Sequence, residues 1–243
     1  MVYEVFLSTK LDIDGLTKGS GFIVIKPEDY NLNEIKGIKS KGYKVLAYLN
    51  IGTIKKGEAW WTNYSEYKLK KYKDELEEYY IDIKKTAWQK FVAGRAAELR
   101  KRGFSGLWLD NIDIYNEYKT KEMFTALASI FFRCRIGGYI MINGGAEWID
   151  EAIKRGETIT KYIDGYTQSE IFYKIVNNSD GIKFEKQESL VSKALKKIVL
   201  SAKEKRIQCF VIEHVENINA RARIKKWCEK NKIVYCFLPT ARQ

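Results

Sequence analysis

Eight short apolar segments recur along the chain, and they limit the possible folds more than any other feature of the sequence. Their lengths are typical of β-strands, and their nearly continuous apolar character is typical of strands buried on both faces. The predicted strands are Tyr3–Leu7, Phe22–Lys26, Lys44–Asn50, Gly106–Asp110, Tyr139–Asn143, Gly165–Gln168, Gln208–Glu213 and Val234–Leu238.

Segments with a helical apolar period separate these strands. They lie at Asn31–Lys41 and around Trp88–Leu99, Met123–Phe131, Leu190–Val199 and Ile218–Cys228. Alternating strands and helices predict parallel pairing with right-handed crossovers. Eight units in 243 residues predict a closed α/β barrel, a single (β/α)8 TIM-barrel domain over residues 1–243. A doubly wound sheet is the alternative, but the first strand is not followed by a GxGxxG sequence and the chain has no Walker A motif, which disfavours nucleotide binding of those types.

Two long insertions follow the carboxyl ends of predicted strands, where a barrel carries its active site. They span Thr53–Lys85 and Ile171–Gln187. Trp60 and Trp61 in the first insertion are predicted to stack on sugar rings. The alternative is that these two side chains anchor the loop to the barrel.

Polar side chains stand at the ends of the predicted strands. They are Asn50, Asp110, Asn143, Glu170 and Glu213. In a barrel these ends meet at one mouth, and two carboxylates there with aromatic walls are typical of glycoside hydrolases. Alternation along Gly106–Asp110 predicts that Trp108 and Asp110 point inward and that Leu107 and Leu109 face the helices. For Asp110 and Asp113 a role at a helix N-terminus is the alternative.

Several motifs occur in a recognisable order. They read KVLAYLNIGT, IDIKKTAWQKFV, GFSGLWLDNIDIY, MINGG and YIDGYTQSEIFY. Over roughly residues 20–240 this order resembles the endo-α-1,4-polygalactosaminidase-type glycoside hydrolases, glycoside hydrolase family 114 and its bacterial and archaeal relatives. The resemblance implies a (β/α)8 barrel and a glycosidase that cleaves an amino-sugar polysaccharide internally, without a cofactor.

The same resemblance implies roles for individual residues. Asp110 and Glu170 correspond to the two catalytic carboxylates, with Asp110 as nucleophile or base and Glu170 as general acid. Asn143 and Tyr48 carry over as substrate contacts. Retention requires carboxyl groups about 5–5.5 Å apart and inversion about 6.5–9.5 Å, and the sequence leaves this choice open.

Further substrate contacts are predicted from their positions. The set is Asn50, Trp60, Trp61, Asp113, Tyr166 and Glu213. Glu213 has alternatives, because it could tune Glu170 or pair with a Lys or Arg at the barrel rim. His214 is expected to be structural or to lie at the rim.

Two positions depart from the family pattern. Relatives often carry an acid where this chain has Lys26, and an acidic or Ser-Glu element where it has Thr53. These departures favour a second hypothesis, a carbohydrate-binding TIM barrel without catalytic activity. Retention of both Asp110 and Glu170 favours the hydrolase.

The net charge of +12 bears on the binding partner. The lysines are scattered along helices, which indicates a solvated surface, so nucleic acid is not expected as a partner. The expected partner is a polysaccharide or oligosaccharide. Polygalactosamine is a polycation and suits this chain only if the cleft is locally acidic; an N-acetylated, neutral or anionic glycan is the alternative.

The remaining expectations concern metal, thiols and location. With one histidine and no CxxC motif, a metal site is not expected. Cys209 and Cys236 are predicted to be buried thiols, with a disulfide as the alternative. No apolar run is long enough for a membrane span, and a monomer is expected. The chain shows no signal peptide; the resemblance implies an extracellular or cell-surface protein after leader removal, with a cytoplasmic location as the alternative.

Overall fold

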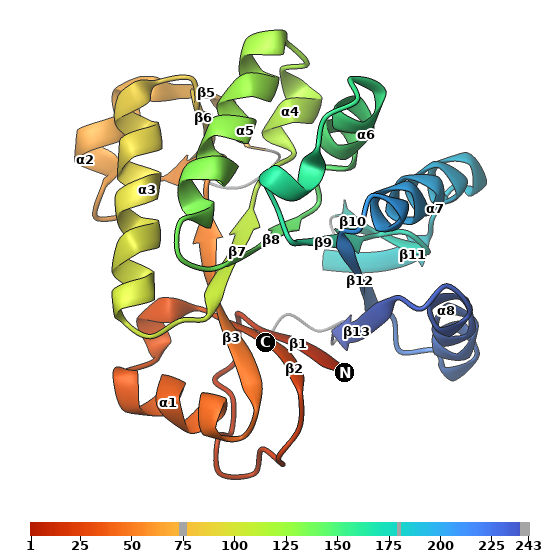
Figure 1. The fold of residues 1–243 in the computed structure, drawn as a ribbon. Coiled ribbons are helices and arrows are strands. Elements are labelled where there is room, and N and C mark those ends of the chain that lie inside the picture. Colours follow the sequence, from red (N-terminus) through yellow and green to blue (C-terminus); the bar gives the residue numbers. More distant parts are fainter. Residues whose placement is uncertain (73–76, 179–180, 239–243) are drawn as a thin grey trace.

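The computed structural model describes residues 1–72, 77–178 and 181–238. Its centre is an eight-stranded, all-parallel sheet that curves into a nearly closed barrel with helices outside it (Figure 1). The first and last strands in the order contact each other. The predicted (β/α)8 fold class is confirmed.

The barrel strands follow the predicted segments within one residue at each end. Their order in the sheet is β1 (Val2–Phe6), β2 (Gly21–Ile25), β3 (Tyr43–Asn50), β7 (Gly106–Asp110), β8 (Tyr139–Asn143), β9 (Gly165–Ser169), β12 (Gln208–His214) and β13 (Val234–Leu238). Strand order therefore equals chain order, as successive right-handed crossovers require.

Helices cover the outside of the barrel. The longer ones are α1 (Leu32–Ser40), α3 (Thr86–Lys101), α5 (Lys121–Arg135), α6 (Ala146–Lys154), α7 (Ser189–Glu204) and α8 (Ile218–Lys230). Shorter elements are α2 (Trp61–Tyr64), α4 (Ile114–Glu117), η1 (Pro27–Asp29), η2 (Ser65–Tyr67) and η3 (Ile159–Lys161). In the part of the chain that the structure describes, none of the helices has the length and apolar character needed to cross a membrane.

The core has two layers, one inside the barrel and one between the barrel and its helices. Trp108 lies in the inner cluster, and Leu107 and Leu109 lie in the outer one, which confirms the alternation predicted for β7. Trp108 Nε1 donates to the Tyr3 hydroxyl at 2.9 Å, and that hydroxyl is 2.9 Å from Thr167 Oγ1. These contacts join three strands below the carboxyl-terminal mouth.

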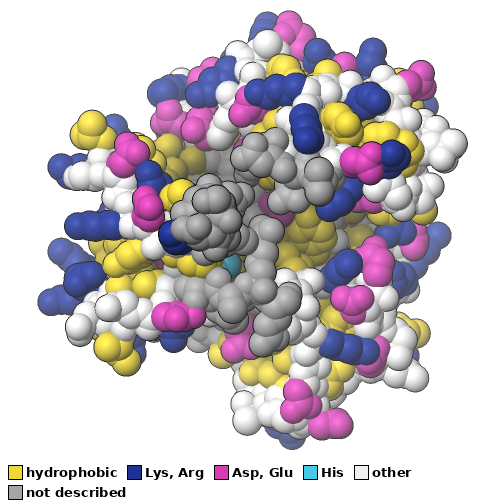
Figure 2. Space-filling view, turned by 180° about the vertical axis from the view of Figure 1, so that it is seen from behind, with side chains coloured by type: hydrophobic (Ala, Val, Ile, Leu, Met, Phe, Trp, Pro, Cys, Tyr) yellow, Lys and Arg dark blue, Asp and Glu magenta, His cyan; other side chains and the backbone are white. Residues whose placement is uncertain are grey.

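Charged side chains are spread over the surface. Figure 2 shows Lys and Arg side chains scattered among Asp and Glu on the face seen there, as the scattered lysines of the sequence predict. All four cysteines are free and buried, so Cys209 and Cys236 are thiols as predicted.

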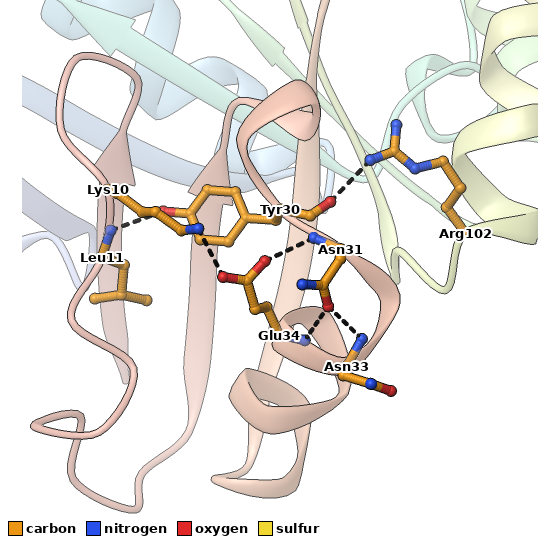
Figure 3. Close-up of polar contacts among 7 residues, drawn as sticks. All are labelled: Lys10, Leu11, Tyr30, Asn31, Asn33, Glu34 and Arg102. Atoms are coloured by element: carbon orange, nitrogen blue, oxygen red, sulfur yellow. Dashed lines mark hydrogen bonds and ion pairs between the residues drawn. The ribbon is translucent and has the colours of Figure 1, made fainter.

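The connection from β1 to β2 contains no helix in residues 7–20, all of which are described. It is held against α1 by polar contacts (Figure 3). The Asn31 side chain accepts from the backbone N–H of Asn33 and Glu34, and Glu34 accepts from Asn31 N at 2.7 Å, forming a capping box. Glu34 also pairs with Lys10 at 2.6 Å, which ties the connection to this helix end.

Both predicted insertions form small antiparallel sheets. The first contains β4 (Thr53–Lys55), β5 (Lys68–Lys71) and β6 (Glu78–Ile81) in the order β4-β6-β5. The second contains the hairpin of β10 (Tyr173–Asn178) and β11 (Gly181–Lys186). Both follow the carboxyl end of a barrel strand, β3 and β9, so they build up the mouth of the barrel.

Gly52 allows the backbone after β3 to approach the backbone after β7. A Cβ atom at position 52 would lie 1.9 Å from the carbonyl oxygen of Asn111, which directly follows Asp110. We expect Gly52→Ala to lower the free energy of unfolding by about 1–3 kcal/mol, because the backbone must move. Urea unfolding measures this change.

Gly94→Ala is the matched control for this substitution. Gly94 lies in α3, is exposed, and has no atom within 4 Å of an added Cβ. Alanine there should raise the free energy of unfolding by about 0.5–1 kcal/mol, since glycine disfavours a helix interior. Equal effects of the two substitutions would contradict the close approach at Gly52.

Candidate active site

A cavity of about 700 Å³ opens at the carboxyl ends of the barrel strands, and both Asp110 and Glu170 line it. The structure thus brings together two carboxylates that are far apart along the chain. The lining residues are Val5, Leu7, Ser8, Thr9, Tyr72, Trp108, Asp110, Asn111, Ile112, Asp113, Asn116, Asn143, Gly144, Gly145, Ala146, Glu147, Gln168, Ser169, Glu170, Ile175, Gln187, Leu195, Ile212, His214 and Leu238.

Asp110 ends β7 and receives a hydrogen bond from the neighbouring strand. Asn143, the last residue of β8, donates from Nδ2 to Asp110 Oδ1 at 2.9 Å. A donor aimed at a carboxylate favours its ionised form. The contact therefore suits a nucleophile or base. The Nδ2 group of Asn143 is used to bind Asp110.

The backbone beyond Asp110 is held by a hydrogen-bond network centred on Thr53, which is buried. Thr53 Oγ1 accepts from Asn50 Nδ2 and from Asn111 Nδ2, each at 2.7 Å, and donates to Glu78 Oε1 at 2.5 Å. Asn111 has a left-handed backbone with φ of 61°. The amide contacts of this threonine fix the turn that carries Asp110.

The network also explains the departure at Thr53. Where relatives carry an acidic element, this chain has a threonine whose hydroxyl donates to the carboxylate of Glu78 on β6. A carboxylate is therefore present beside this position, supplied by a different strand. Lys26, the other departure, is exposed and precedes η1.

Glu170 directly follows β9 and has a left-handed backbone, with φ of 57°. Its Oε2 accepts from Ile175 N at 3.3 Å, and its carbonyl oxygen accepts from Gln187 Nε2 at 2.9 Å. Ile175 lies in β10 and Gln187 directly follows β11, and both residues line the cavity. The hairpin therefore helps to place this carboxylate.

Glu213, predicted to contact substrate, is not among the described residues that line the cavity. Only 1% of the side chain is exposed. Its Oε1 accepts from Ile171 N at 2.7 Å and Phe172 N at 2.9 Å, and its Oε2 accepts from Tyr173 N at 3.1 Å. Backbone amides therefore bind this carboxylate, where the alternative interpretation expected a Lys or Arg at the barrel rim.

Burial raises the pKa of the Glu213 carboxyl to about 7, although the three amide donors lower it, and the nearby charge of Glu170 raises it further. Glu213 is thus a buried acid that changes charge near neutral pH.

The cavity is acidic although the chain is basic. Of the described residues that line it, four are carboxylates and none is Lys or Arg. The four are Asp110, Asp113, Glu147 and Glu170. A local excess of negative charge in a concave site attracts cations and repels anions.

The other predicted substrate contacts differ in their placement. Asp113 lines the cavity, and its Oδ2 accepts from the Tyr80 hydroxyl at 3.4 Å. Tyr166 is fully buried in the outer core, and its hydroxyl donates to Gln168, so its side chain cannot reach a substrate. Tyr48 packs on Trp108 with ring centroids 5.9 Å apart, and neither it nor Asn50 is among the lining residues.

Trp60 packs against helix α3 of the barrel, and Trp61 packs within its own insertion. Trp60 lies 5.5 Å from Phe91 on α3, and Trp61 lies 6.0 Å from Tyr79 on β6, measured between ring centroids. Neither is among the lining residues described. The contact of Trp60 corresponds to the alternative in which it anchors the insertion to the barrel.

The sequence prediction did not name Glu147, which lines the cavity. Glu147 lies in the first turn of α6, just after the Gly144–Gly145 turn that follows β8. His214, expected at the rim or in a structural role, lines the cavity and stacks on Phe184 with centroids 5.2 Å apart. Alternation along β12 could have found it, because His214 has the parity of the inward residues Phe210 and Ile212.

The fold and the cavity define a protein of the (β/α)8-barrel class with an acidic cavity at the carboxyl ends of its strands. Within that class, a model of glycoside-hydrolase family GH114 matches residues 14–133, which confirms the family resemblance carried by the sequence motifs. The protein MJ1477 of Methanocaldococcus jannaschii is 24% identical over 178 residues, 66% of this chain. The chain spans about half, 49%, of that relative's length.

Two solved structures share the fold over nearly the whole chain. The glycoside hydrolase domain of PelA from Pseudomonas aeruginosa has a TM-score of 0.79 at 17% identity, covering 98% of this chain and 94% of that one. Ega3 of Aspergillus fumigatus, solved in complex with galactosamine, has a TM-score of 0.73 at 11% identity, covering 98% and 90%. At these identities the likeness concerns the fold.

The raised pKa of Glu213 has a consequence for stability. Between its ordinary value of 4.5 and about 7, folded Glu213 keeps a proton that the unfolded chain releases. Stability from this group is therefore full below pH 4.5 and falls as the pH rises to 7. Relative to Glu213→Gln, the free energy of unfolding of the wild type should fall by up to about 3 kcal/mol across this window.

Urea unfolding of both proteins between pH 4 and about 8 measures this difference. Glu204→Gln is the control, since it removes an exposed acid at the end of α7. Parallel stability curves for the wild type and Glu213→Gln would contradict the raised pKa.

Proposed function

We propose that this protein is an endo-acting glycosidase that hydrolyses an amino-sugar polysaccharide, with Asp110 and Glu170 as its catalytic carboxylates. One observation carries the proposal: the cavity that holds both carboxylates has four acidic lining residues and no Lys or Arg among the lining residues described. In a chain with a net charge of +12, this arrangement separates the cleft electrostatically from the rest of the surface.

The charge of the cavity selects among the glycans left open by the sequence. A polymer of unacetylated amino sugars carries ammonium groups, which four carboxylates attract. An anionic glycan would be repelled, and a neutral N-acetylated glycan would gain nothing from them. We therefore propose a cationic amino-sugar polymer, a substrate class also supported by the galactosamine bound to the similar protein Ega3. Internal cleavage is proposed from the family resemblance.

The two carboxylates have different environments, which supports different roles. Asp110 accepts from Asn143, so its ionised form is stabilised for attack or for activation of water. Glu170 lies across the cavity on another strand end and supplies the proton to the leaving oxygen. Asp113 and Glu147 remain for the ammonium groups of the substrate.

The departures that favoured a non-catalytic binding barrel do not alter this proposal. Thr53 donates to the carboxylate of Glu78, and Lys26 is exposed outside the set of lining residues. An extracellular or cell-surface location, where such polymers accumulate, is proposed together with the substrate.

Removal of either catalytic carboxylate tests the reaction. Asp110→Asn and Glu170→Gln should each lower kcat by at least about 100-fold on partly de-N-acetylated poly-N-acetylgalactosamine, because each removes a group that acts in the transition state. Reducing-end release measures hydrolysis, and thermal unfolding shows that the variants fold. Activities within about tenfold of the wild type for both variants would refute the pair.

The charge preference is tested at Glu147. Glu147→Gln should raise KM for the cationic polymer roughly two- to fivefold at low salt, since one charge contact at the half-buried Glu147 contributes up to about 1 kcal/mol. The effect should shrink with added salt and be absent on a fully N-acetylated polymer. Glu204→Gln removes an acid far from the cavity lining and should leave KM unchanged. A preference for the N-acetylated polymer in the wild type would refute a cationic substrate.

A further inference from the structure

Glu213 is a buried carboxylate that the proposed chemistry does not use. We propose that Glu213 is a positioning residue, which holds the catalytic carboxylate of Glu170 in the cavity by binding the three backbone amides that follow it. This inference rests on the proposed function for the role of Glu170, while the contact itself is independent of that role.

The contact is close and complete. Both carboxylate oxygens are used, with Oε1 accepting from Ile171 N and Phe172 N at 2.7 and 2.9 Å, and Oε2 from Tyr173 N at 3.1 Å. Glu213 is 1% exposed, Ile171 is buried, and Phe172 and Tyr173 are half-buried. Without this acceptor, three consecutive amides would lose their hydrogen bonds in a place largely removed from water, which is costly.

Glu170 needs such a restraint because of its backbone. Along β9, strict alternation would give Glu170 the direction of Tyr166, whose side chain is fully buried in the outer core. The left-handed φ of 57° at Glu170 interrupts this alternation, and its side chain lines the cavity instead. A left-handed conformation at a non-glycine residue is unfavourable, so the surrounding structure must maintain it.

Glu213 itself sits on the outer side of β12. It lies on the same face of the strand as Cys209 and Val211, which pack in the outer core. Phe210 and Ile212 lie on the other face and point into the barrel. Its carboxylate therefore reaches the start of the loop after β9 from behind the cavity. This placement supports Glu170 without occupying space that a glycan needs.

Three titratable groups interact electrostatically with Glu213. Glu170 precedes the bound amides, Lys196 comes from α7, and Cys228 comes from α8. Lys196 Nζ lies 4.1 Å from the centroid of the Phe172 ring, next to the loop that Glu213 binds. Because burial raises the pKa of Glu213 to about 7, its charge changes near neutral pH, and its ionised form is the stronger acceptor.

The kinetic test uses Glu213→Gln, with Glu204→Gln as the matched control. Glutamine has the same shape but presents an NH2 group to one of the three amides. We expect kcat to fall on the order of 10- to 100-fold with KM within about threefold, because Glu170 acts in the transition state rather than in substrate binding. The wild-type kcat should contain a rise through pH 7 that Glu213→Gln lacks.

A second measurement does not depend on activity. In the wild type, the amide proton shifts of Ile171, Phe172 and Tyr173 should titrate together with a midpoint near pH 7, and Glu213→Gln should abolish this titration. Glu170→Gln should keep it, which separates the two acids. This readout remains valid for a wild type that cleaves no glycan, an outcome that refutes the proposed function alone.

Two results would overturn the inference. One is an absence of a shared titration at the three amides. The other is a Glu213→Gln variant whose kcat and pH profile match those of the wild type. A lower kcat with an unchanged pH profile would also overturn it, because that result indicates a general structural role only.

Discussion

The parallel register of the barrel strands is the constraint on which the site depends. Asn50 pairs with Asp110 between β3 and β7, and Asn143 pairs with Thr167 between β8 and β9, so the strands end at nearly the same level. Because all strands run in one direction, every strand end reaches one mouth. A shift of one residue in β7 would turn Asp110 toward the helices and bring Leu109 into the cavity. The polar contact between Trp108 and Tyr3 below the mouth fixes this register from inside.

The distribution of charge follows from the same geometry. The lysines of α7 and α8 lie on helices outside the barrel, where their side chains are solvated and scattered. The carboxylates of the cavity lie at strand ends and on the turns directly beyond them, on the side of the barrel where the insertions after β3 and β9 stand. Screening limits interactions in solution to about 8 Å at physiological salt, so a basic exterior and an acidic cleft act on a ligand separately.

The sequence predicts the barrel well because its signals are local. Continuous apolar runs place all eight strands, and alternation within β7 gives the direction of Asp110. The sequence did not show the strands of the two insertions, since short polar strands carry weak periodic patterns, and the helix α6 was left out although its pattern is amphipathic. Its position at a strand end suggested Glu213 as a substrate contact. The alternation of inward and outward residues along β12 instead places it on the outer side of the barrel. Glu170 is the opposite case. Alternation along β9 would turn its side chain away from the cavity, and its left-handed backbone interrupts that alternation.

Glu170 and Glu213 therefore form a pair of acids at the ends of neighbouring strands with their roles separated by environment. The β9–β12 pairing places them close enough for each charge to affect the other, yet Glu170 lines an open cavity while Glu213 is enclosed by backbone amides. Different surroundings are a general means by which two carboxylates of one site acquire different tasks. In this chain, the desolvated acid on the outer side of the barrel stabilises the turn that directs the solvated one inward. A family comparison based on strand-end acids alone cannot distinguish these two functions, because that distinction comes from the side of the sheet on which each carboxylate lies.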